Sequence, residues 1–306
     1  MRSGATDALR GACDAVIDQM GQSVAVAGNE DVGQVATERR WRRVVVDGVS
    51  LDAMREADVV EHVVTNARAG VGGLVVTANV DHLRQISSGG RLADAYRSAT
   101  LAVADGQPIV WAARLQGERL PERVTGASLL WTLAEAAADA GVSVGLVGGQ
   151  GESSSRAATK LAERWPHLDV RLVAAPRVSG DPTPAEVDRM CALVRGARPS
   201  IVFLAFGAPK QELLGAALRV VLPDVWFLGV GASFEMAGGR VRRAPHLLQR
   251  GGLEWAWRLA REPRRLAHRY LVQDLPYVPR LLAGALRQRG RPVQDRPPAD
   301  HRSCGG

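Results

Sequence analysis

Short apolar runs alternate with longer amphipathic stretches through the middle of the chain. The runs are apolar on consecutive residues, as expected of strands that are covered on both faces. The predicted strands are Val44–Val46, Leu74–Thr77, Leu101–Ala104, Val142–Val147, Val170–Ala174, Ile201–Phe206 and Trp226–Val230. Stretches with apolar residues three and four positions apart predict helices, among them Leu129–Ala140, Ala157–Trp165 and Val187–Val194. The repeated strand-helix order predicts an α/β fold with a doubly wound, mostly parallel, Rossmann-like sheet.

The pattern changes toward both ends of the chain. Residues 1–40 lack sustained periodicity, which indicates a poorly ordered extension before an α/β core at 41–240. Residues 241–290 are an Arg-rich amphipathic stretch and predict a separate C-terminal helical appendage. The polar, Pro-rich residues 291–306 predict a disordered tail. Because no long uncharged apolar run and no signal-like segment occurs, we expect no membrane span and no export.

Composition narrows the class of protein. With 46% hydrophobic and 23% charged residues, the chain is typical of a soluble globular protein, and collagen-like or wholly disordered classes are excluded. The cysteines at 13, 191 and 304 form no CxxC pair, so neither a disulfide framework nor a zinc site is expected. This usage predicts a reducing compartment, and we expect the protein to be cytoplasmic.

Charge is distributed unevenly along the sequence. The net charge is +7, but the segment from Arg240 to the end holds 15 arginines against 5 acidic residues. Such a segment favours a polyanionic partner, which is a nucleic acid, an anionic membrane surface or a phosphorylated substrate.

Polar residues lie where two of the predicted strands end. Thr77 and Asn79 close one strand, and Asp105 directly follows another. In parallel sheets the carboxyl ends of the strands meet at one edge, where ligands bind. A carboxylate there acts as a general base, a ribose ligand or a metal ligand, or it forms only an Asx turn. Asn79 either contacts a ligand or caps the following helix.

Three further motifs offer groups for an anion. Arg123 precedes a predicted helix start and is either an anion clamp or a solvated side chain. Gly148 and Gly149 in GLVGGQGE either admit a diphosphate to backbone amides or form a tight turn. This motif is neither GxGxxG nor a P-loop. Arg243, in the basic cluster of residues 229–245, either binds phosphate or is solvated.

The motif FGAPKQE at 206–212 places Lys210, Gln211 and Glu212 in the first turn of a predicted helix that faces the same edge. Lys210 is one of two lysines in the chain, although a plain helix start remains the alternative. Glu235 follows the last predicted strand. No His/Cys/Asp/Glu group has metal-ligand spacing, no nucleophile signature occurs, and the six scattered histidines receive no catalytic role.

In their order and spacing, four blocks of sequence resemble the WecG/TagA/CpsF family of bacterial glycosyltransferases. They are TANVDHL, ADGQPIVWAARLQGERLPERVTGASLL, FGAPKQE and GVGASFEMAGGRVRRAPHLLQRGGLEWAWRLAREPRRLAHRYL. The resemblance runs from about Val44 to Leu271, roughly three quarters of the chain.

The resemblance implies an inverting, metal-independent enzyme without a cofactor. Its donor would be a UDP-sugar of the N-acetylmannosamine or N-acetylmannosaminuronate type, and its acceptor a polyprenyl-diphosphate-linked sugar at the inner membrane face. The product would serve cell-wall biogenesis, such as teichoic acid, or exopolysaccharide biosynthesis. A homo-oligomer is also possible.

The resemblance also implies roles for individual residues. Asp105 looks like the general base, Thr77 and Asn79 like polar active-site contacts, Arg123 like a substrate-positioning group and Gln211 like a nucleotide-sugar contact. The functional arginines of the family's C-terminal segment match Arg258, Arg265 and Arg269.

Two departures from the family are visible. Glu235 stands where the family usually has Asp, which puts a direct nucleotide contact there in doubt. Residues 1–40 and the chain after about Arg280 have no counterpart in the family's compact members.

The chemistry of glycosyl transfer needs one base and one stabiliser for the leaving diphosphate. Arg123, the amides of the Gly148 turn and the C-terminal arginines could replace the divalent cation that many such enzymes use. A basic segment with Trp255, Trp257 and Tyr270 also suits an anionic membrane surface, or it packs on the core with solvated arginines.

Two other function classes compete with a transferase. A doubly wound dinucleotide enzyme predicts GxGxxG after the first strand, which the sequence lacks. A nucleic-acid-binding protein would explain the basic C-terminal segment but would leave Asp105, Thr77 and Gln211 without a purpose. We therefore expect no nucleic-acid partner.

Overall fold

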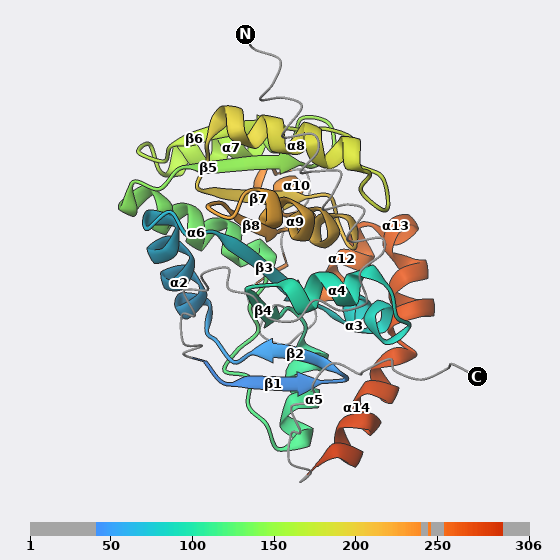
Figure 1. Ribbon diagram of the computed structural model, residues 1–306. Coiled ribbons are helices and arrows are strands. Elements are labelled where there is room, and N and C mark those ends of the chain that lie inside the picture. Colours follow the sequence, from blue (N-terminus) through green and yellow to red (C-terminus); the bar gives the residue numbers. More distant parts are fainter. Residues whose placement is uncertain (1–40, 240–243, 246–253, 290–306) are drawn as a thin grey trace, which may run out of the picture.

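The computed structural model describes residues 41–239, 244–245 and 254–289 (Figure 1). The expectations for residues 1–40, for Arg243 and for 291–306 lie outside these ranges, as does the side chain of Arg265.

Six parallel strands form the central sheet, in the order β4-β3-β8-β7-β5-β6 (Figure 1). The strands are β3 (Gly73–Ala78), β4 (Leu101–Ala104), β5 (Val144–Gly148), β6 (Val170–Ala174), β7 (Ile201–Ala205) and β8 (Trp226–Gly229). The predicted parallel α/β sheet is confirmed, and β4 and β6 begin and end at the predicted residues.

The predicted strand Val44–Val46 lies outside this sheet. It belongs to β1 (Arg43–Val46), which pairs antiparallel with β2 (Val49–Asp52) in a hairpin that sequence analysis missed. Asp47 and Gly48 both have positive φ angles, 50° and 79°, as a two-residue hairpin turn requires. A connection of two residues is too short for the crossover that parallel strands need. The two strands therefore pair antiparallel with each other.

Helices cover both faces of the sheet. They are α2 (Glu56–Arg68), α3 (Val80–Ser87), α4 (Arg91–Ser98), α5 (Gln107–Gln116), α6 (Gly126–Ala140), α7 (Ser153–Arg164), α8 (Pro184–Ala197), α9 (Lys210–Val221) and α10 (Ser233–Ala237). Along β3, Val75 packs with α2, α6, α7 and α10, whereas Val76 faces the core formed by α4, α5, α8 and α9. This alternation is that of a strand buried on both sides, and the doubly wound fold is confirmed.

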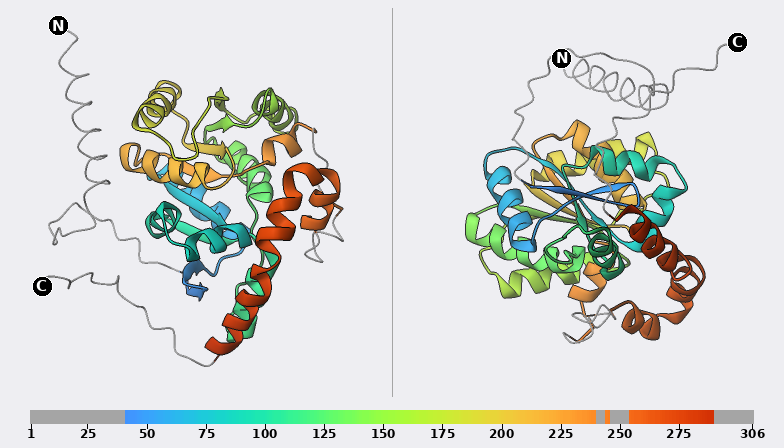
Figure 2. Two further views of the ribbon diagram at one scale, coloured as in Figure 1. Left: turned by 90° about the vertical axis from the view of Figure 1, so that its right-hand side faces the viewer. Right: turned by 90° about the horizontal axis from the view of Figure 1, so that it is seen from below.

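The C-terminal segment is helical. It comprises α12 (Glu254–Arg261), α13 (Pro263–Ala267), the π-helix η1 (His268–Asp274) and α14 (Tyr277–Gln288). α14 lies along α5 (Figure 2), where Leu281 and Ala285 join the main core and Gln116 Nε2 donates a hydrogen bond of 2.8 Å to Gln288 Oε1. This packing connects α14 closely to the α/β core, and the proposed division at residue 241 stays a prediction. None of the helices in the described ranges combines the length and apolar character needed to cross a bilayer.

Candidate active site

Asp105 lies at the carboxyl edge of the sheet, directly after β4. Its backbone N–H donates a 2.7 Å hydrogen bond to the carbonyl of Ala78 at the end of β3. Its carboxylate accepts a hydrogen bond from the N–H of Gly126, the first residue of α6. A Cβ on Gly126 would lie 2.8 Å from the carbonyl oxygen of Gly229, so only glycine lets α6 begin this close to β8. The carboxylate thus faces a helix N-terminus, which favours negative charge.

Three charged side chains surround this carboxylate. Burial raises the pKa of Asp105 to about 7, while Arg123 lowers it, Glu254 raises it and Arg258 lowers it again. Both Nη1 and Nη2 of Arg123 donate to Oε2 of Glu254 at 3.1 Å. Glu254 and Arg258 belong to α12, so the C-terminal segment supplies two of the charges at the carboxyl end of β4.

The predicted C-terminal arginines differ in what they contact. Arg258 contributes to the field at Asp105, and its buried Nε has no hydrogen-bond partner among the described residues. Arg269 lies 4.8 Å from the ring centroid of Tyr270 and lowers the pKa of Asp274. Burial, the largest influence on Asp274, raises its pKa to about 6.

A buried polar network runs beside these charges. His82 is 2% exposed; its Nδ1 lies 2.6 Å from the Tyr96 hydroxyl and its Nε2 lies 3.9 Å from Oε1 of Glu212. Burial, followed by the charges of Glu212 and Asp105, raises the pKa of Tyr96 well above its ordinary value. The network therefore lies within electrostatic reach of Asp105.

Asn79 and Thr77 border this network. The Oδ1 of Asn79 accepts a 3.0 Å hydrogen bond from the backbone N–H of His82, so Asn79 is the N-cap of α3. Thr77 is buried within β3, at 5% exposure. The helix-cap interpretation of Asn79 therefore applies in this structure.

Gln211 joins the loops that follow β7 and β8. Its Oε1 accepts hydrogen bonds from the N–H groups of Gly207 (3.1 Å) and Gly231 (2.9 Å), and its Nε2 donates to Oε1 of Glu212 at 2.8 Å. A Cβ at Gly229 would lie 2.6 Å from this Nε2. The side chain of Gln211 thus holds two strand ends in register, while Oε2 of Glu212 is buried without a hydrogen-bond partner in the described part of the chain.

The glycine-rich turn after β5 already holds a carboxylate. Gly148 and Gly149 have φ angles of 102° and 80°, a conformation that favours glycine. Oε1 of Glu235, from α10, accepts hydrogen bonds from the N–H of Gln150 (3.1 Å) and from the Ser153 hydroxyl (3.4 Å). An acidic side chain of the protein therefore binds a backbone amide before α7, at the turn for which the sequence left open a diphosphate site or a tight structural turn.

Lys210 contacts a different loop. Its Nζ donates a 3.0 Å hydrogen bond to the carbonyl of Val178, between β6 and α8. The ammonium group thus connects the start of α9 to the chain after β6.

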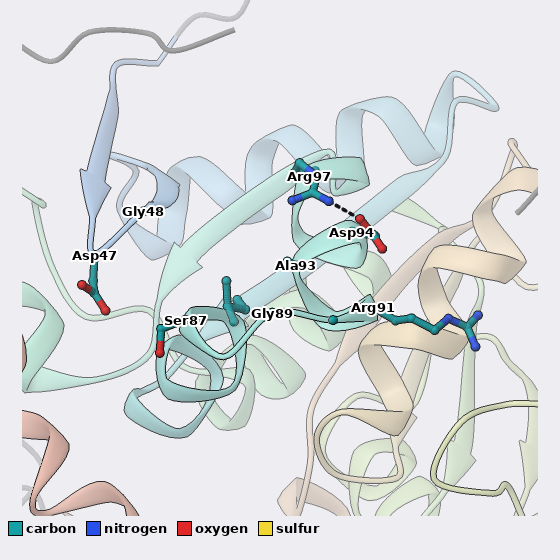
Figure 3. A pocket seen from close by; sticks show the side chains of 10 residues that line it. Asp47, Gly48, Ser87, Gly89, Arg91, Ala93, Asp94 and Arg97 are labelled. Atoms are coloured by element: carbon teal, nitrogen blue, oxygen red, sulfur yellow. Dashed lines mark hydrogen bonds and ion pairs between the residues drawn. The ribbon is translucent and has the colours of Figure 1, made fainter. Parts of the chain in front are cut away.

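A surface pocket of about 570 Å³ lies between the β1–β2 turn and α4. Asp47 and Gly48 line one side of it, and Arg91, Asp94 and Arg97 line the other (Figure 3). The side chains of Arg97 and Asp94 pair with each other. None of the predicted site residues lines this pocket, so it is distinct from the Asp105 edge.

Sequence analysis singled out Asp105 and Arg123 but not the neighbouring His82, Tyr96 and Glu254. His82 lies within the quoted block TANVDHL, and its place beside Asn79 was the one available signal. Tyr96 lies on the next helix, and Glu254 is 131 residues from Arg123 in the chain. No local spacing pattern connects such positions.

A carboxylate beside two arginines, at the carboxyl edge of a doubly wound parallel sheet, is the arrangement of an α/β enzyme that binds its ligand at this edge. A comparison with known families matches residues 44–291 to the Glycosyl transferase WecG/TagA/CpsF family. The chain belongs to this family and is a glycosyltransferase, which confirms the resemblance. The match runs to residue 291 and includes α14, so it extends past Leu271, where the sequence resemblance ended. That the family's compact members lack the chain after about Arg280 stays a prediction.

Proposed function

We propose that this glycosyltransferase moves an N-acetylmannosamine-type or N-acetylmannosaminuronate-type sugar from UDP to a polyprenyl-diphosphate-linked sugar, with inversion. The observation that carries the proposal is the Asp105 carboxylate, whose pKa of about 7 is set by burial and modulated by Arg123, Glu254 and Arg258. A base with a pKa of about 7 is about half ionised at neutral pH and is basic enough to accept a proton. The product would enter cell-wall or exopolysaccharide biosynthesis.

In the proposed reaction, Asp105 accepts the proton of the acceptor hydroxyl while the hydroxyl oxygen bonds to the anomeric carbon of the donor. The bond from that carbon to the diphosphate oxygen breaks on the opposite face, and its electron pair leaves with UDP. Because Asp105 acts on the acceptor and forms no bond to the sugar, a single displacement inverts the anomeric configuration.

Negative charge develops on the leaving diphosphate. Arg123 and Arg258 both act electrostatically on Asp105, and the Nε of Arg258 has no hydrogen-bond partner among the described residues. We expect the two guanidinium groups to donate to the diphosphate, which is the electrostatic stabilisation that such a transition state needs. These two guanidinium groups support transfer without a divalent cation. Within the described residues no group of three or more His, Cys, Asp or Glu side chains is placed to hold a metal ion.

The direct test is transfer in vitro. We expect one member of a panel of UDP-sugars to be consumed with a soluble polyprenyl-diphosphate-sugar analogue, and mass spectrometry to show the acceptor extended by one sugar. EDTA should leave the initial rate unchanged, since arginines take the role of the cation. If EDTA abolished the rate and magnesium restored it, the metal-free proposal would be rejected. If the enzyme consumed none of the UDP-sugars in the panel, the proposed donor class would be rejected.

A lipid-linked acceptor requires contact with a membrane, and the C-terminal segment supports such contact. Its exposed large apolar side chains include Trp255 (41%), Leu271 (46%), Val272 (61%) and Leu275 (50%). Arg261 and Arg264 are exposed on the same segment. Aromatic and aliphatic groups insert into the interface, and each nearby arginine contributes about 1 kcal/mol at an anionic surface. We therefore infer peripheral binding at the inner membrane face.

Replacing Leu271, Val272 and Leu275 together by Ser should reduce co-sedimentation with vesicles that contain anionic lipid, because less apolar surface enters the interface. Val220→Ser, which removes an exposed apolar side chain (55%) at the end of α9, is the control and should sediment like the unmodified protein. Equal sedimentation of all three proteins would place the membrane contact elsewhere. Substitutions are preferred to deletion of the C-terminal segment, because deletion would also remove Leu281 and Ala285 from the core.

A further inference from the structure

The candidate anion-binding arginine is already occupied by a carboxylate. Both terminal nitrogens of Arg123 donate to one oxygen, Oε2 of Glu254, at 3.1 Å. The side chains are only 18% and 12% exposed, so the pair is shielded from solvent more than a surface ion pair. The same two N–H donors are the fork with which a guanidinium binds the oxygens of a phosphate.

The second candidate anion site, the glycine-rich turn after β5, also binds a carboxylate, that of Glu235. This carboxylate is held in place by its helix. Glu235 belongs to α10, where the neighbouring Phe234 is fully buried and Gly238 N–H bonds back to the Phe234 carbonyl at 2.8 Å. Glu254 is instead the first residue of α12, a helix in which no side chain is fully buried. Of the two carboxylates, Glu254 is therefore the one that can move at low cost.

The guanidinium group of Arg258 offers a further hydrogen-bond donor on the same helix as Glu254. Arg258 lies one helical turn after Glu254, and its buried Nε has no hydrogen-bond partner among the described residues. Burying an unpaired donor is unfavourable, so a ligand that accepts from Arg258 would gain this contact in addition to Arg123. A diphosphate has enough oxygens to accept from both groups at once.

We propose that the Glu254 carboxylate holds the place of the substrate's diphosphate on Arg123, and that the diphosphate displaces it when the donor binds. The inference rests on the proposed nucleotide-sugar donor and adds a residue to its site. Binding of the donor then has to break the Arg123–Glu254 pair. The observed affinity for the diphosphate is therefore lower than it would be if Arg123 were unpaired. Because Glu254 belongs to α12, the donor also changes how this helix contacts the core.

The test is equilibrium binding of UDP, and separately of inorganic pyrophosphate, to the full chain by calorimetry. Glu254→Gln keeps the size of the side chain but removes the competing charge, and we expect it to tighten binding of both ligands by about tenfold. Glu163→Gln removes the same charge from an exposed side chain paired with Lys160 and should leave both affinities unchanged. In an Arg123→Gln background the effect of Glu254→Gln should vanish, as a double-mutant cycle requires for groups that act on each other.

The binding results distinguish displacement of Glu254 from the alternatives. Equal or weaker binding of both ligands by Glu254→Gln, or an equal gain in the Arg123→Gln background, would overturn the displacement. Tighter pyrophosphate binding without any UDP binding would keep the role of Glu254 and reject the proposed UDP donor. A purely structural role for Glu254 predicts weaker binding and a lower melting temperature, which the same samples report.

Discussion

Asp105→Asn is expected to lower the turnover number at least ~100-fold while UDP binding stays intact, because removal of a general base costs about 10²–10⁴ in rate. The amide keeps the shape of the side chain and can still accept a hydrogen bond from Gly126, so the start of α6 should be preserved. The measurement is single-turnover transfer to a soluble lipid-diphosphate sugar analogue.

The control for this variant is Asp139→Asn, which removes the same charge from an exposed position near the other end of α6. It should transfer sugar at the unmodified rate. Near-normal transfer by Asp105→Asn would falsify the base assignment and move the search to other groups at this edge of the sheet.

The pH dependence of the reaction follows from the same residue. Burial raises the pKa of Asp105 to about 7, so the reactive carboxylate dominates above that pH and is lost as the pH falls. Below about pH 6, kcat/KM should fall about tenfold per unit, and this acid limb should be absent from the residual activity of Asp105→Asn.

Arg123→Ala is expected to lower kcat by about 10²–10³, the cost of removing one donor from a developing oxyanion. Arg123→Lys keeps the charge but loses the two-pronged donor geometry, so it should recover only part of the rate. Steady-state kinetics with a saturating acceptor would measure both effects.

Arg119→Ala is the matched control because Arg119 is exposed in the same loop, between α5 and α6. It should leave kcat unchanged. If Arg123→Ala changed only KM, Arg123 would contribute to binding of the ground state and the leaving-group role would be wrong.

Much of the fold could be predicted from the sequence because buried parallel strands are apolar on consecutive residues. Leu101–Ala104, a fully buried strand, was located to the residue in this way. Val170–Ala174 was also located to the residue, although Arg171 interrupts its apolar run and none of its residues is fully buried. The β1–β2 hairpin was missed because its second strand, VSLD, mixes polar and apolar residues and is too short for a clear pattern. Its turn at Asp47 and Gly48 was the signal that could have predicted it.

The candidate site was predictable only where its residues directly follow a strand or directly precede a helix. Asp105 was found because it comes immediately after β4, and Arg123 because it precedes α6. Glu254 is brought to Arg123 by tertiary packing, and the contact of His82 with Glu212 joins α3 to α9. Contacts across such separations depend on how helices pack, which local sequence does not report.

The anchoring of α14 along α5 has a consequence for the segment that carries Glu254 and Arg258. This segment is tethered at both ends, by β8 and α10 before it and by α14 after it, so α12 cannot diffuse away when its contacts with the core break. The effective concentration of its arginine at the reacting centre is therefore set by loop length and not by how much enzyme is present. Cleaving the chain once between α12 and α14 would leave α12 attached only on its α10 side, so the effective concentration of Arg258 should fall to the value that this one connection sets.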